Sequence, residues 1–156
     1  MTAHRSATSI CDRLADGHTN VLSAFGPDKP TLRPETASWL RERADALFLS
    51  TITAAEIEAG IAKLHRTGAP RRAERLRGWL DRILEQYTDR VLSFDLPAAR
   101  IAGGFIDAAQ AQGRHPGFAD ISIAAIAHVH QLTILTVNLR HFRPLGVDAL
   151  NPFASN

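Results

Sequence analysis

The chain has 156 residues, the length of one domain with a substantial core, and its 45% hydrophobic and 22% charged residues are ordinary for a globular protein. No apolar run reaches about 18 residues, so we expect no membrane span, and the N-terminus lacks the apolar core of a signal peptide. The single cysteine, Cys11, fits a reducing compartment, and we therefore expect a cytoplasmic protein.

The predicted elements alternate between strands and helices along the chain. Residues 1–17 show no clean period, and we expect a weak first strand or a disordered, diverged lead there, followed by one domain over residues 18–153. Beyond it the pattern predicts, in order, helix 35–46, strand 47–50, helix 53–66, helix 71–87, strand 90–94, helix 95–111, a helix from Asp120, strand 132–137 and strand 147–150. This order predicts an α/β sandwich with a mainly parallel sheet.

Ligands of such sheets bind at the carboxyl ends of the strands, so the polar residues near these ends are candidates for a site. Asp120 opens an otherwise apolar, buried helix, where the helix dipole favours an anion or a metal ligand. The ordinary alternative is that Asp120 caps the helix. Glu56 follows strand 47–50, but its spacing from Thr53 also matches a capping box.

Two carboxylates that meet at one sheet end repel each other unless a cation lies between them. A hard divalent ion such as Mg²⁺ or Mn²⁺ is the usual solution, and such ions promote phosphodiester hydrolysis. Two acids far apart in a sequence are common, so spacing alone is a weak signal.

Basic residues concentrate in the middle of the chain. The formal net charge is only +2, and the 18 basic residues are arginines except Lys29 and Lys63. The densest positive region spans residues 63–82, and it is either a solvated helix face or a surface that follows nucleic-acid phosphates. Its candidates for nucleic-acid binding are Arg66, Arg71, Arg72 and Arg75.

Four motifs occur in an order and at intervals that resemble a known family. They are His18-Thr-Asn-Val-Leu-Ser, Ser50-Thr-Ile-Thr-Ala-Ala-Glu-Ile-Glu-Ala-Gly60, Gly117-Phe-Ala-Asp-Ile-Ser-Ile-Ala-Ala and Thr136-Val-Asn-Leu-Arg-His-Phe142. Together they resemble PIN-domain ribonucleases, in particular the VapC-type toxins of the FitB-like branch. The resemblance implies a PIN-like three-layer α/β/α sandwich with a mainly parallel central sheet.

The resemblance also implies a set of site residues. The family's second and third acids fall on Glu56 and Asp120, which would hold Mg²⁺ or Mn²⁺, and its fourth position falls on Asn138. The supporting residues would be Thr19, Asn20 and Thr136.

This chain departs from the family pattern at the first acid. That position is His18, and Asp16 replaces the acid only if the backbone shifts. A further Asp that is often seen before the Phe is here His141. We expect weaker metal binding from the loss of a carboxylate.

Two functions follow as hypotheses. The first is a Mg²⁺- or Mn²⁺-dependent endoribonuclease toxin, inhibited by a VapB-type antitoxin, with Glu56, Asp120, Asn138 and His18 at its catalytic site. The alternative is a weakened or inactive PIN-fold protein that binds its antitoxin and, through it, operator DNA. Either would form a homodimer and neither would contact a membrane. A generic hydrolase or nucleotide-binding domain is disfavoured because the sequence has no Gly-rich phosphate loop and no Gly-x-Ser-x-Gly.

Overall fold

The structure, a computed structural model, describes residues 9–11, 22, 26–27 and 32–154. Its strands form a five-stranded sheet of order β3-β2-β1-β4-β5 in which every neighbouring pair is parallel. They are β1 (Ser9–Cys11), β2 (Leu47–Ser50), β3 (Val91–Leu92), β4 (Thr133–Leu135) and β5 (Ala149–Leu150). The predicted α/β class with a parallel sheet is confirmed.

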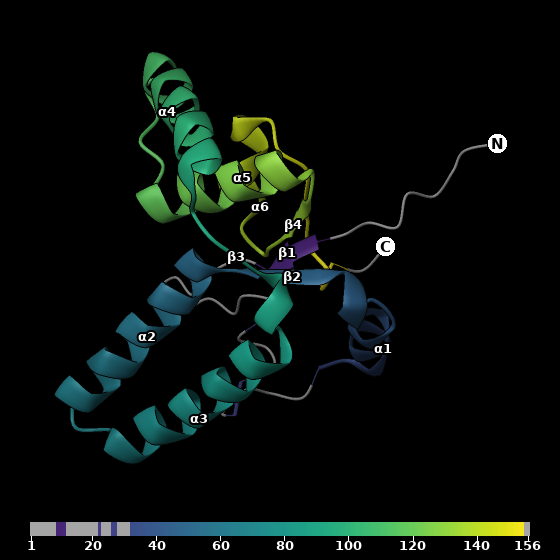
Figure 1. Ribbon diagram of the computed structural model, residues 1–156, viewed down its shortest axis with the longest axis vertical. Helices are drawn as coiled ribbons and strands as arrows, with labels where there is room; N and C mark the ends of the chain where they lie inside the picture. The colour runs from purple at the N-terminus through teal and green to yellow at the C-terminus, as the bar shows by residue number, and fades with distance from the viewer. Residues whose placement is uncertain (1–8, 12–21, 23–25, 28–31, 155–156) are drawn as a thin grey trace.

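Helices cover both faces of the sheet and complete the predicted three layers (Figure 1). One layer contains α1 (Pro34–Glu42), α2 (Thr51–Arg66) and α3 (Pro70–Gln86). The other contains α4 (Leu96–Ala111), α5 (Phe118–His130) and the short α6 (Leu139–Phe142). Single 3₁₀ turns connect some of these elements: η2 (Ala44–Ala46), η3 (Thr88–Arg90) and η4 (Arg143–Leu145).

The strands supply both layers with apolar side chains because successive residues point to opposite faces. Ile134 packs in the core of α4, α5 and α6, whereas the adjacent Leu135 packs in the core of α1, α2 and α3. Phe48 and Leu49 of β2 divide in the same way. A parallel sheet covered on both faces therefore explains why these strands read as continuous apolar runs.

Helix α5 is the most deeply buried helix that the structure describes. All of its residues from Asp120 to Ala127 are buried. It packs along α4 in one layer and contributes most of the core on that face of the sheet. The sequence prediction of a buried helix here is confirmed, and the polar side chains of Asp120 and Ser122 are held within the core.

Strand β1 lies between β2 and β4. The strand order reverses at this position, because β2 and β3 lie on one side of β1 and β4 and β5 lie on the other. Cys11 of β1 is in register with Leu49 of β2 and with Leu135 of β4, so the three strands end together. In parallel α/β sheets this switch point is where ligands bind. Residues that follow β2 and β4 in the chain are thus brought to one edge.

The start of α2 differs from the prediction. Helix α2 begins at Thr51, and the Oγ of Ser50 accepts a hydrogen bond of 3.0 Å from the Thr53 backbone N–H. Ser50 is the last residue of β2 and has the extended backbone that an N-cap requires. The expected capping box of Thr53 and Glu56 is therefore wrong, and Glu56 lies in the second turn of α2.

Several other boundaries are shorter than predicted. Helix 35–46 ends at Glu42 and is followed by the separate turn η2, and strands 90–94 and 132–137 shrink to the residues of β3 and β4. The two edge strands, β3 and β5, each pair over only two residues, so the flanking apolar residues lie outside the sheet ladder. None of the described helices is both long and apolar enough to cross a membrane.

The corrected cap gives a testable stability difference. We expect Ser50→Ala to lower the free energy of unfolding by roughly 1 kcal/mol, because the first turn of α2 loses its acceptor. Urea denaturation measures this loss, and Asp95→Ala, which removes the analogous cap of α4, gives a reference value. Thr53→Val, which removes the 2.9 Å hydrogen bond between the Thr53 and Ser50 hydroxyls but keeps the Thr53 N–H, should cost less than Ser50→Ala. A Ser50→Ala variant as stable as the unmodified chain would contradict the cap.

Candidate active site

Asp120 is a buried carboxylate in the first turn of α5. The helix begins at Phe118 with Gly117 as its N-cap, so Asp120 is the third helical residue and not the cap that the sequence also allowed. Gly117 takes an extended backbone and its carbonyl accepts the first helical bond, from the Ile121 N–H at 3.1 Å. Asp120 is 3% exposed, so its carboxylate needs partners in place of water.

His141 is one such partner. Its Nδ1 lies 3.0 Å from the Asp120 Oδ2, and its side chain is 33% exposed whereas that of Asp120 is 4% exposed. His141 lies on α6, which follows β4, whereas Asp120 lies near the start of α5, so the contact joins two separate helices. The ring therefore fixes one oxygen of the buried carboxylate and remains reachable from outside.

The residues after β4 form a second small group. The buried Thr136 accepts a hydrogen bond of 3.0 Å from the Asn138 backbone N–H. Asn138 is the N-cap residue of α6, but its side chain does not cap the helix. In the described part of the chain, His141 rather than Asn138 is the α6 residue that contacts Asp120. In the sequence, His141 stood out only because it replaces an Asp that is often seen in the family pattern. That replacement was the available signal that His141 belongs to the site.

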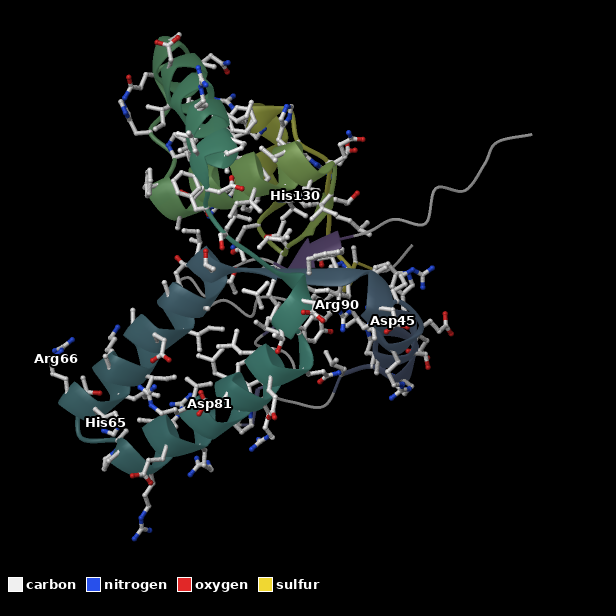
Figure 2. All side chains as sticks on the ribbon, viewed as in Figure 1. Asp45, His65, Arg66, Asp81, Arg90 and His130 are labelled. Carbon is white, nitrogen blue, oxygen red and sulfur yellow. The ribbon has the colours of Figure 1, made fainter. Side chains whose placement is uncertain are left out.

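The structure places the other predicted residues differently. Glu56 is half-buried on α2, which starts at the carboxyl end of β2. The arginines proposed for RNA binding are exposed around the turn between α2 and α3, and Figure 2 shows Arg66 at the end of that hairpin away from the sheet. The structure thus separates them from Asp120. The predicted residues His18, Thr19, Asn20 and Asp16 lie outside the described residues.

The donors that the site offers suit a hard cation. Among the described residues, no three or more His, Cys, Asp or Glu side chains are grouped to hold one ion. Mg²⁺, however, keeps several waters and is commonly bound by one or two carboxylates together with substrate phosphates. Asp120 and Glu56 fit that pattern, and the His141 nitrogen is a donor that suits Mn²⁺ better than Mg²⁺.

A sequence profile described as "PIN domain" matches residues 18–145. This match covers most of the chain, and the parallel sheet with a buried acid on its core helix agrees with it. The chain belongs to the PIN-domain family.

Relatives and solved structures agree with this assignment. The chain is 33% identical over 142 residues to VapC ribonuclease Y4jK of Sinorhizobium fredii (86% of this chain, 94% of the relative). It is 33% identical over 138 residues to toxin FitB of Neisseria gonorrhoeae (86% and 95%). A crystal structure of FitAcB from Neisseria gonorrhoeae superposes with a TM-score of 0.73 at 30% identity (86% and 94%). A structure of FitAB bound to an IR36 DNA fragment gives 0.73 at 28% identity (86% and 92%).

The contact between Asp120 and His141 predicts how the site responds to added charge. We expect His141→Asp to lower the free energy of unfolding by roughly 1–3 kcal/mol without divalent ions, because it sets a second carboxylate beside a buried one. Millimolar Mg²⁺ should restore much of this loss by binding the native state. Thermal or urea unfolding with and without Mg²⁺ measures both effects.

His141→Asn is the matched control, since it removes the imidazole without adding charge. A variant His141→Asp that is as stable as His141→Asn in the absence of metal, or that does not respond to Mg²⁺, would contradict the proposed cation-binding character of this pair.

Proposed function

We propose that this chain is the toxin of a VapBC-type toxin–antitoxin pair and acts in the cytoplasm as a metal-dependent endoribonuclease. The observation that carries the proposal is the Asp120 carboxylate, which is 3% exposed on the core helix of a PIN domain. An apolar residue at this position would stabilise the core at least as well as a buried acid. We therefore attribute the acid to a chemical role. The relative named a VapC ribonuclease supports the reaction class.

Each residue of the site has a distinct part in this proposal. Asp120 and Glu56 hold the metal, and Mg²⁺ or Mn²⁺ when bound supplies an activated water and neutralises charge on the scissile phosphate. His141 holds the Oδ2 of Asp120 and so orients the carboxylate. Thr136 fixes the backbone of Asn138 at the start of α6, and Asn138 then offers a side-chain amide to water or phosphate.

The remaining ligand would come from the segment after β1. His18 occupies the position of the family's first acid, with Thr19 and Asn20 as supporting residues. Strand β1 ends at Cys11, and the acids that follow it in the sequence are Asp12 and Asp16. Because the acid in question follows the first strand in the family pattern, Asp12 joins His18 and Asp16 as a candidate.

The partners of this function are a VapB-type antitoxin, a second copy of the chain, RNA and, through the antitoxin, operator DNA. The structural relatives named FitAcB and FitAB bound to DNA support this assembly. Exposed apolar side chains support a protein partner. Leu96 is 71% exposed and Phe118 is 62% exposed. The ring of Phe118 packs edge-on against that of Phe94, with 5.7 Å between the ring centroids. Arg66, Arg71, Arg72 and Arg75 would attract RNA at longer range.

The second candidate function is a PIN-fold partner protein that binds its antitoxin without cleaving RNA. The contact of His141 with Asp120 favours it, because an imidazole stands where family members often carry a further acid. A site with fewer carboxylates binds a metal ion more weakly. A tenfold higher Kd for the metal corresponds to a loss of only about 1.4 kcal/mol of binding free energy.

Cleavage of RNA separates the two functions. We expect the chain to cut single-stranded RNA in Mn²⁺ or Mg²⁺, and we expect Asp120→Asn and Glu56→Gln each to reduce the rate by at least about a hundredfold. Glu58→Gln on the same helix is the control, since Glu58 pairs with Arg77 at 3.1 Å. Absence of metal-dependent cleavage by the unmodified chain would support the partner protein instead, whereas equal loss in all three variants would contradict the assignment of Asp120 and Glu56 to the site.

A further inference from the structure

A cavity of about 500 Å³ opens beside Asp120 and has no role yet in the proposed function. It lies between the turn that joins α4 to α5 and the corner formed by α6 and η4. The side chains of Arg114, His115, Arg140 and His141 line it together with Asp120. Its volume is within the range of pockets that hold a small organic ligand.

The groups on the polar side of the cavity can bind an anion. The exposed side chains of Arg114 and Arg140 make no hydrogen bond or ion pair within the described part of the chain, so both guanidinium groups remain available. Gly117 also lines the cavity, and as the N-cap of α5 it has no side chain to cover the N–H groups of the first turn. Both features favour a phosphate, which arginine binds with two parallel hydrogen bonds.

The other side of the cavity is apolar. Pro116, Pro144 and Leu145 contribute carbon surface, and Ala109 of the buried face of α4 lies behind them. A ligand with one anionic end and one flat or apolar end matches this division. A nucleotide has this character, since its phosphate takes arginine and its ribose and base pack on apolar or guanidinium surfaces.

We infer that this cavity binds one nucleotide of single-stranded RNA next to the scissile phosphate, with Arg114 and Arg140 on phosphate and Pro144 and Leu145 against ribose or base. The inference rests on the proposed function and adds to it a binding site for one nucleotide of the substrate. The arginines proposed earlier for RNA binding lie elsewhere: Arg66 is at the end of the α2–α3 hairpin away from the sheet (Figure 2), and Arg71, Arg72 and Arg75 lie in the first two turns of α3. Arginines there cannot position a phosphate at Asp120, whereas Arg114 and Arg140 line the same cavity as that carboxylate.

The first experiment measures binding without cleavage. A fluorescent 2′-O-methyl single-stranded RNA is titrated with the full chain in EDTA, and anisotropy gives the Kd at several salt concentrations. We expect Arg114→Ala and Arg140→Ala each to raise the Kd by about tenfold. Each should also make the negative slope of the logarithm of the association constant against the logarithm of the salt concentration shallower by about 0.7. Because neither metal nor cleavage is involved, this result does not depend on the nuclease proposal.

The matched control is Arg100→Ala. Arg100 is an exposed arginine of α4 that does not line the cavity and lies roughly 13 Å along the helix axis from Ala109. Its loss should change the Kd by less than about twofold. Equal effects of all three substitutions would overturn the inference, since they would reflect total charge alone. Unchanged RNA binding in both cavity variants, with weakened binding of the antitoxin, would assign the cavity to the protein partner instead.

A second readout locates the RNA directly. On titration with the same oligonucleotide, the ring proton signals of His115 and His141 should shift in NMR spectra, because both rings line the cavity. The rings of His65 and His130, at the hairpin end and at the end of α5, should not shift (Figure 2). A shift of His65 with no shift of His115 would place the RNA on the hairpin and overturn the inference.

Discussion

A carboxylate that is buried on an apolar helix must be stabilised by its surroundings, and the rest of this site follows from that requirement. Burial of a carboxylate without partners would cost several kcal/mol, so the fold must offer Asp120 interactions in exchange for water. The fold offers the first turn of α5, where the helix dipole favours an anion, and the ring of His141 at 3.0 Å. The contact with His141 depends on β4, which connects the end of α5 to the start of α6.

The same geometry links the structure to the proposed chemistry. Strands β1, β2 and β4 end in register, so the segments that follow them approach one another at the point where the winding changes direction. Glu56 follows β2, Thr136 and Asn138 follow β4, and Asp120 is held on the core helix. The cavity lined by Arg114 and Arg140 also contains Asp120, so side chains of both charges meet there.

The sequence predicted the long elements well and the local geometry less well. The ranges of α2 and α3 and the buried character of α5 were legible because they depend on neighbours within one or two turns. The cap of α2 was not, since Ser50 and Thr53 are both good capping residues and only the end of β2 selects Ser50. The pairing of His141 with Asp120 was also beyond the sequence, because it joins α6 to α5 through tertiary packing. The cavity arises from the same packing, so its arginines carried no local signal.

The most direct test of the central claim, that Asp120 holds a divalent metal, is calorimetric titration of Mn²⁺ and Mg²⁺ into this chain, into Asp120→Ala and into His18→Asp. We expect this chain to bind Mn²⁺, Asp120→Ala to abolish the binding, and His18→Asp to strengthen it by adding an acid. Binding that survives in Asp120→Ala would contradict the assignment of the ligand. Binding that occurs only in His18→Asp would mean an intact scaffold with a disabled site, and would contradict the nuclease function in favour of the partner protein.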